Sequence, residues 1–83
     1  MIKIVYSEIE SPTNLEEADN LNKSSGVRAI NIATKPASIT IAAHSGQKSI
    51  TLAGGESVIL KKDSYDKVFA SAKTIRIAGV SIY

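Results

Sequence analysis

His44 is the only histidine of the chain and the first residue whose type suits it to chemistry. A Ser-His-Asp site would need it as the base, because no other side chain here has an unperturbed pKa near neutrality. The chain has eleven serines, so a serine close to this histidine is expected by chance. His44 also stands directly before Ser45-Gly46, a turn signal. The pattern therefore predicts a solvent-exposed loop histidine, and no catalytic residue.

Asp63 and Asp66 could contact one cation through their carboxylate oxygens. Calcium sites gather about six to eight oxygens, and nothing near this pair completes such a set. We therefore expect Asp63 to form a turn by accepting a backbone N–H. Gly54-Gly55 lacks the spacing of a phosphate loop and is not followed by a Lys-Ser or Lys-Thr helix start, so it predicts a tight hairpin turn. No metal-binding or cofactor-binding residue is predicted.

Basic side chains are concentrated in the later part of the chain. Residues 1–20 carry one lysine against five acidic residues, a net charge of −4, whereas residues 21–83 carry nine basic and three acidic residues, a net charge of +6. A basic groove in a small β-barrel would suit single-stranded nucleic acid, but such sites also need aromatic side chains for base stacking. The chain has four aromatics, of which Phe69 is expected in the core. Nucleic-acid binding is therefore the alternative hypothesis and not the leading one. Its candidate residues are Arg28, Lys35, Lys48, Lys61, Lys62, Lys67, Lys73 and Arg76.

Short β-branched runs are the elements that would position all these residues. The chain has twelve isoleucines and five valines, whose stiff branched side chains fit a pleated sheet. Turn signals recur about every eight to twelve residues, which predicts an all-β fold, a small antiparallel β-sandwich or barrel of about six to eight short strands. Within it, the stretch Ile39–Lys62 holds three runs separated by two turn signals and predicts an antiparallel meander.

The chain is expected to form a single β-domain over residues 1–83, in which residues 7–26 are a partly irregular, acidic N-terminal segment. Thr13 and Glu16 have the spacing of a capping box, yet a helix of about ten residues is marginal, so an extended piece around Leu15 is preferred. No cysteine is present and no apolar run approaches the roughly 20 residues that span a membrane. A chain this short, without disulfides, depends on an efficient core or on partner subunits.

Period-two alternation predicts which strand faces are buried. The run Ser57–Lys61 is nearly continuous in apolar residues and predicts a strand covered on both faces. Gly79 stands where the alternation of the last strand changes phase, which predicts a bulge. The expected core residues are Ile4, Ile30, Ile32, Ile39, Ile41, Ile50, Leu52, Val58, Leu60, Val68, Ile75 and Ile77.

The order of these runs resembles a group of small β-rich virion proteins of marine tailed bacteriophages, especially those of cyanobacteria. The resemblance is carried by Val27-Arg28-Ala29-Ile30-Asn31-Ile32, by Ser38-Ile39-Thr40-Ile41-Ala42 and by Ile50 to Asp63, which includes Leu52-Ala53-Gly54-Gly55-Glu56-Ser57. An Asp66-Lys67-Val68 strand follows, and the match covers most of residues 12–83. Tyr65 departs from the pattern, because a smaller or turn-forming residue is more usual at that position.

The resemblance implies a non-enzymatic structural protein, a capsid decoration or cement protein, with a neck or tail accessory protein as the alternative. Its partners would be the major capsid protein or other virion proteins, in a homo-oligomer or symmetric array, without a membrane. The protein would be made in the host bacterial cytoplasm and reside in the virion. The acidic N-terminal segment and exposed aromatics are the predicted partner contacts: Glu16, Glu17, Asp19, Tyr65 and Tyr83.

Overall fold

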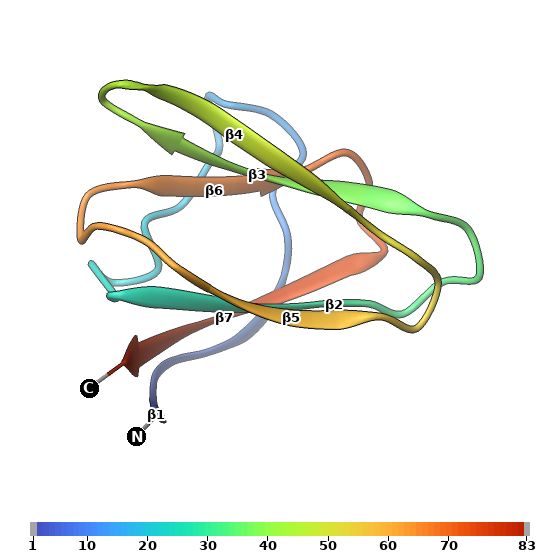
Figure 1. The fold of residues 1–83 in the computed structure, drawn as a ribbon, viewed down its shortest axis with the longest axis horizontal. Helices are drawn as coiled ribbons and strands as arrows, with labels where there is room; N and C mark the ends of the chain where they lie inside the picture. The colour runs from blue at the N-terminus through green and yellow to red at the C-terminus, as the bar shows by residue number, and fades with distance from the viewer. Residues whose placement is uncertain (1, 83) are drawn as a thin grey trace.

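The computed structural model describes residues 2–82, which contain seven β-strands and no helix (Figure 1). The all-β prediction is confirmed, and the described residues include no helix that could cross a membrane. The strands are β1 (Ile2–Glu10), β2 (Gly26–Asn31), β3 (Ala37–Ala43), β4 (Gly46–Leu52), β5 (Ser57–Lys61), β6 (Lys67–Ala70) and β7 (Ile75–Ile82).

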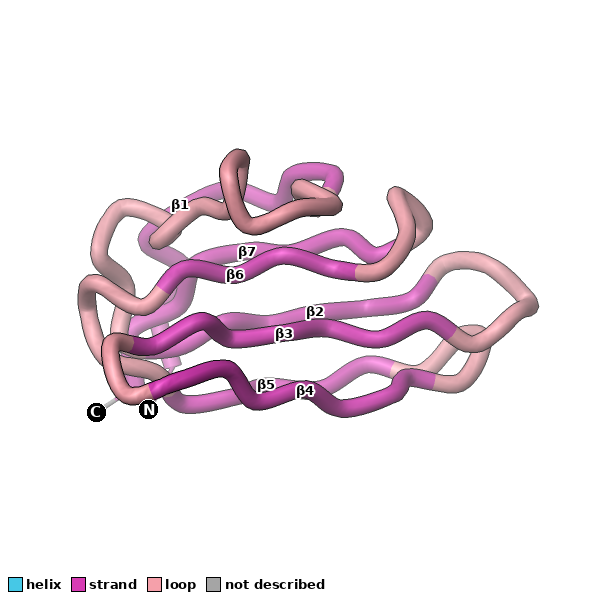
Figure 2. The backbone as a smooth tube through the Cα atoms, turned by 90° about the horizontal axis from the view of Figure 1, so that it is seen from above, coloured by secondary structure: helices cyan, strands magenta, loops and turns pink. Residues whose placement is uncertain are grey.

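The strands form two antiparallel sheets that stack face to face. One sheet has the order β1-β7-β2-β5 and the other the order β4-β3-β6. Seen from above, β4 lies over β5, β3 over β2, and β6 over β7 (Figure 2). Of the two predicted architectures the sandwich is therefore the one formed. Burial of one face of each sheet against the other is what makes such a two-layer arrangement stable.

The stretch Ile39–Lys62 is not the continuous meander that the sequence predicts. β3 and β4 do form a hairpin, but β5 pairs with β2 in the opposite sheet. Gly54 shows why, since a Cβ there would lie 2.5 Å from the carbonyl oxygen of Thr34, so the chain leaving β4 runs against the link between β2 and β3. The N–H of Gly55 then donates to the carbonyl of Asn31 at 2.8 Å, which brings the chain to β2.

Residues on β2 face the core with the opposite parity from the prediction. Val27, Ala29 and Asn31 are fully buried, whereas Ile30 is half-buried and Ile32, just beyond the strand, is 59% exposed. A shift of one position turns every side chain of a strand to the other face. Pairing with β5 and β7 on both sides fixes this parity, so the larger side chains do not decide it.

The predicted core is right in part. The confirmed members are fully buried: Ile39, Leu52, Val68, Ile75 and Ile77. Four others are half-buried: Ile30, Ile41, Val58 and Leu60. Three are exposed, and their prediction was wrong: Ile4 at 71%, Ile32 at 59% and Ile50 at 42%. Small side chains that alternation did not single out fill the remaining interior between the sheets: Val27, Ala29, Ala37 and Ala70.

Asn31 is a fully buried polar residue at the end of β2. Its Nδ2 donates to the carbonyls of Lys35 at 2.8 Å and of Leu52 at 3.1 Å, and its Oδ1 accepts from the N–H of Ala33 at 3.1 Å. Because the amide is satisfied on both sides, its burial avoids the penalty of an unpaired polar group. The side chain thereby fastens the link after β2 to the end of β4.

Gly79 does not form the predicted bulge in β7, whose register with β2 is regular throughout. The irregularities lie in the neighbouring β1, on either side of Tyr6. A Cβ at Gly79 would lie 2.8 Å from both the Tyr6 Cβ and the Leu21 carbonyl oxygen, so the glycine makes room for these two residues. The apolar residues change from one face of β7 to the other after Gly79 because Val80 and Ile82 face away from the core by register.

The acidic N-terminal segment begins at Ser11 and not at residue 7, because β1 continues to Glu10. No helix forms in it, as predicted, but the extended piece expected around Leu15 is wrong. Leu15 lies in a turn in which the N–H of Ala18 donates to its carbonyl at 3.3 Å. The segment starts along the edge of β6, where Ala70 donates to the carbonyl of Pro12 at 2.8 Å.

Leu21, Asn22 and Lys23 follow with φ values of 56°, 57° and 58°, three consecutive non-glycine residues in the left-handed region. That conformation disfavours residues with a Cβ by roughly 1–2 kcal/mol each. The turn inserts the Leu21 side chain between the sheets, where it is fully buried. Burial of this leucine offsets part of the strain of the turn, since a fully buried leucine stabilises by about 1.5–3 kcal/mol.

Candidate interaction surfaces

The predicted partner contacts divide between exposed and structural residues. Glu16 and Glu17 are exposed in the turn after Asn14, whose Oδ1 accepts from the N–H of Glu17 at 2.9 Å. Tyr65 is 72% exposed, and the Lys23 ammonium lies 5.2 Å from its ring centre, within range of a cation–π contact. The fifth predicted contact, Tyr83, lies outside the described residues.

Asp19 has a structural role in addition to any contact it makes. Its Oδ1 accepts from the N–H of Leu21 at 2.8 Å, which holds the start of the left-handed turn. Its backbone exchanges two hydrogen bonds with Val68 in β6, at 2.9 and 3.2 Å. Asp19 therefore ties the N-terminal segment to the sheet edge and lies half-buried beside it. Of the predicted acidic contacts, Glu16 and Glu17 are the exposed ones, and Glu17 Oε1 accepts from Asn14 Nδ2 at 3.4 Å.

The residues first considered for chemistry do not assemble a reactive site. His44 is exposed in the hairpin loop between β3 and β4, as predicted. The turn at Asp63 exists, but its roles are reversed, because the Asp66 carboxylate accepts from the Asp63 N–H at 3.0 Å. Within residues 2–82 no group of three or more His, Asp or Glu side chains is placed to hold a metal ion.

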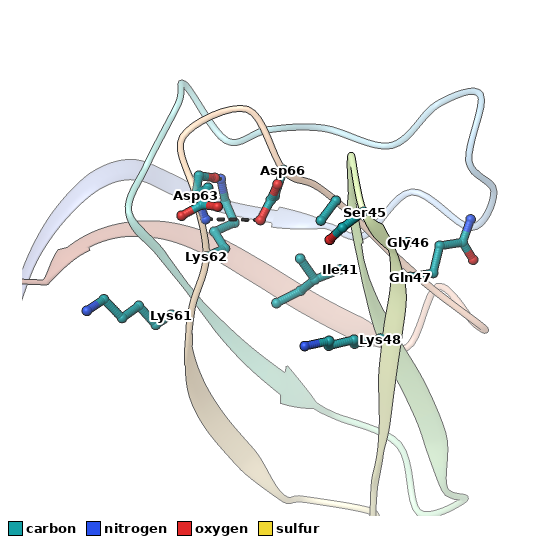
Figure 3. Close-up of a pocket in the computed structure, with 10 residues that line it drawn as sticks. Ile41, Ser45, Gly46, Gln47, Lys48, Lys61, Lys62, Asp63 and Asp66 are labelled. Carbon is teal, nitrogen blue, oxygen red and sulfur yellow. Dashed lines mark hydrogen bonds between the residues drawn. The ribbon is translucent and has the colours of Figure 1, made fainter.

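A hollow of about 420 Å³ opens between the β3–β4 hairpin and the end of β5 (Figure 3). Ile41 contributes to its apolar wall, and Lys48 and Lys61 extend from the two sides. This hollow marks the side of the sandwich where β4 and β5 are the outermost strands, which we call the open flank. The strand arrangement places the edges of β4 and β5 one above the other along this flank (Figure 2).

Lys62 is the buried charge beside this hollow, with only 6% of its surface exposed. Its Nζ donates to the carbonyls of Ser24 at 2.9 Å and of Asp63 at 3.1 Å. Burial lowers the pKa of Lys62, and the carboxylates of Asp66, Asp19 and Asp63 oppose that shift. The ammonium therefore joins the end of β5 to the loop that follows the left-handed turn through these hydrogen bonds.

The outer face of the four-stranded sheet, which points away from the other sheet, carries several exposed isoleucines. Val27 and Ala29 point inward, so the residues that alternate with them along β2 point outward. Residues paired in antiparallel register point to the same side, so the partners of these outward residues in β5 and β7 also point outward. Exposure on this face is 71% for Ile4, 50% for Ile2 and 44% for Ile59. The outward-facing side chains by register are Ile2, Ile4, Glu10, Arg28, Ile30, Ser57, Ile59, Lys61, Arg76, Ala78, Val80 and Ile82.

Ala78 and Val80 are buried, although they lie on this outer face and outside the main core cluster. An ion pair joins Glu8 in β1 to Arg28 in β2 at 3.5 Å, so it crosses the intervening β7. Arg28 is directly opposite Ala78 in the register, which places this pair beside the small alanine side chain. The outer face thus has its own packed apolar centre with exposed isoleucines around it.

Basic residues proposed for nucleic-acid binding are spread over several surfaces. Lys62 is buried and Arg28 is paired with Glu8, so neither is available in the way a phosphate contact requires. Lys48 and Lys61 do lie near each other on the open flank. Tyr6 is half-buried against the core, and the exposed Tyr65 ring is in contact with Lys23.

Sequence reasoning missed the outer face because it assigned Ile4 and Ile30 to the core. The available signal was the total of seventeen isoleucine and valine residues in 83, more branched residues than the interior of so small a sandwich holds. Comparison with protein-family models, with curated proteins and with solved structures found no match to this chain.

Proposed function

We propose that this protein is a non-enzymatic structural component of a bacteriophage particle, a decoration protein that coats the capsid. The exposed isoleucine surface on the outer face of the four-stranded sheet is the observation that carries the proposal. Ile2, Ile4 and Ile59 expose 44–71% of their surface there. A group of exposed apolar side chains on a small protein often marks a site of interaction with another protein.

Attachment would be adhesive, through burial of this isoleucine surface on the shell. Each isoleucine that becomes fully buried contributes about 1.5–3 kcal/mol at most, so a single contact of this size is modest. A shell presents the same site many times, and multivalent binding by linked copies raises the overall affinity. The Glu8–Arg28 pair at the centre of the face adds polar contacts that would fix orientation.

Particles purified from lysates of the producing host provide the direct test. Mass spectrometry should detect the protein as a stoichiometric component, and gold-labelled antibody against the recombinant chain should decorate heads. Label confined to the neck or tail would reassign the protein as an accessory of that part. Absence of the protein from particles would exclude a virion role.

A rebinding assay would then identify the attachment surface. Ile4→Lys places a charge on the outer face, and we expect it to weaken binding to stripped particles at least about tenfold. Thr13→Lys is the matched control, because it adds the same charge to an exposed site in the N-terminal segment. Equal loss in both variants, or in neither, would exclude the outer face as the contact.

A further inference from the structure

We propose that two copies of this chain associate by pairing their β5 strands edge to edge about a two-fold axis. β5 pairs only with β2 among the described residues, so its second edge carries unpaired backbone groups. Such an edge is a template for another strand. The occupant we assign to it is the same strand of a second copy.

The hydrogen-bond pattern shows which groups of β5 face outward. The N–H of Lys62 donates at 3.0 Å to the carbonyl of Ser25, which directly precedes β2, so the backbone groups of Lys62 point toward β2. Backbone groups alternate along an antiparallel strand, so Ser57, Ile59 and Lys61 direct their N–H and C=O groups to the open edge. Pairing centred on Ile59 would bring these three residues opposite the same three of the other copy, with about six backbone hydrogen bonds.

The side chains of β5 suit this pairing in charge and in shape. Antiparallel pairing centred on Ile59 sets Lys61 opposite Ser57 of the second copy, so the two lysines do not confront each other. It also brings the basic end at Lys61–Lys62 to the end that begins at Glu56, and the two-fold axis repeats this approach. Edge lysines normally discourage strand pairing, and in this register Lys61 does not face Lys61 of the other copy.

β5 also has the composition of a strand with neighbours on every side. Its apolar run Val58-Ile59-Leu60 predicts coverage of both faces, yet in one copy Ile59 is 44% exposed and Val58 and Leu60 are only half-buried. A second strand along the edge would cover these side chains from the open flank. The four-stranded sheets of the two copies would then form one continuous sheet of eight strands.

Pairing between copies and attachment to a particle are separate properties of the molecule. A two-fold axis perpendicular to the sheet keeps both outer faces on the same side. The pair would therefore present two isoleucine surfaces in one direction. Failure of pairing would leave attachment through a single outer face intact, and particle binding by a monomer would show that outcome.

Cysteine cross-linking gives the most specific test, because the natural chain has no cysteine. In the proposed register the two Ile59 Cα atoms form a hydrogen-bonded pair about 5.5 Å apart, within the range that a disulfide spans. Under mild oxidation, at a protein concentration where the wild type sediments as a dimer, we expect Ile59→Cys to give a covalent dimer within minutes. Ser49→Cys, exposed on β4 along the same flank, is the matched control and should cross-link at least about tenfold more slowly.

Charge complementation supplies the second test, on side chains that are exposed and do not support the core. Ile59→Lys and Ile59→Glu should each elute as monomers, and an equimolar mixture should restore the dimer, because opposite charges then meet at the axis. Ile32→Lys, on the 59% exposed residue after β2, should remain dimeric. A wild-type chain that sediments as a monomer up to about 1 mM, or cross-linking of Ser49→Cys as fast as Ile59→Cys, would overturn the proposal.

Discussion

Each flank of the sandwich ends in two edge strands, but the chain runs along an edge at only one of them. At the covered flank, residues 12–19 run along β6 and Leu21 closes the space between the sheets. At the open flank, nothing in residues 2–82 pairs with the outer edges of β4 and β5. β4 shows the consequence, because six of its seven residues are exposed.

The difference between the flanks separates what stabilises the fold from what is available to partners. The covered flank uses hydrogen bonds, a buried leucine and a strained turn to protect an edge, which is one of the ways by which proteins avoid unwanted strand pairing. The open flank relies on lysines alone. Substitutions at the covered flank should therefore change stability, and those at the open flank should change association.

Leu21→Ala should have the largest effect, a loss of about 2–5 kcal/mol in the free energy of unfolding. The leucine is fully buried between the sheets, so its removal leaves a cavity. Urea denaturation followed by circular dichroism measures the change. Leu15→Ala, in the same segment but 49% exposed, is the control and should lose less than about 1 kcal/mol. Equal losses in the two variants would show that the covered flank is not closed by Leu21.

Asp19→Ala should cost about 1 kcal/mol, because the Leu21 N–H loses the carboxylate that accepts its hydrogen bond at 2.8 Å. Glu16→Ala removes an equal charge from an exposed site three residues earlier and should be nearly neutral. Thermal denaturation of both variants at one pH compares them directly. A loss in Glu16→Ala as large as that in Asp19→Ala would point to overall charge as the cause.

Lys62 should give the free energy of unfolding a pH dependence of definite sign. Its pKa in the folded protein is lowered by burial from 10.5, so between the lowered value and 10.5 the unfolded chain binds more protons. Stability contributed by this group therefore rises as the pH rises through that window, and its full burial cost is present below it. Denaturation at several alkaline pH values should show this rise in the wild type but not in Lys62→Met. Lys61→Met retains Lys62 and should follow the wild type; loss of the rise there would contradict the assignment.

The smallest effects on folding are expected at the open flank. Lys48→Ala should change the free energy of unfolding by less than about 0.5 kcal/mol, because its exposed side chain belongs to an edge strand. Urea denaturation at low micromolar concentration, where copies are apart, measures the effect on the single chain. A loss approaching that of Leu21→Ala would mean that the open flank supports the fold as much as the covered one.

Strand identity and turn positions could be predicted from the sequence because both depend on neighbouring residues. His44 lies in a turn as expected and the branched runs form strands. Gly54-Gly55 form a turn, but the predicted hairpin is wrong, because β4 and β5 belong to different sheets. Sheet membership could not be predicted in the same way. β5 follows β4 directly in the chain but pairs with β2, since that choice depends on the contact of Gly54 with a distant backbone.

Burial was harder to predict, because alternation gives two faces without saying which is inward. In β2 the larger side chain of Ile30 led to the prediction that its face is buried. Pairing with strands on both sides instead places Val27 and Ala29 on the buried face. Asn31 was missed because its burial depends on carbonyls that only the folded chain brings together. The outer face of isoleucines was missed for the same reason, since an exposed and a buried isoleucine look alike in a sequence.

The left-handed turn at Leu21–Lys23 has a consequence for the order in which the molecule forms. Three residues must enter a disfavoured backbone region before Leu21 has a place to be buried, so this turn gains little until the two sheets have met. Closure of the covered flank is then a late event, after the transition state for folding. Substitutions there should accelerate unfolding while leaving the refolding rate almost unchanged, which stopped-flow measurements on Leu21→Ala would resolve. We therefore expect this turn to affect the lifetime of the native state more than the speed of its formation.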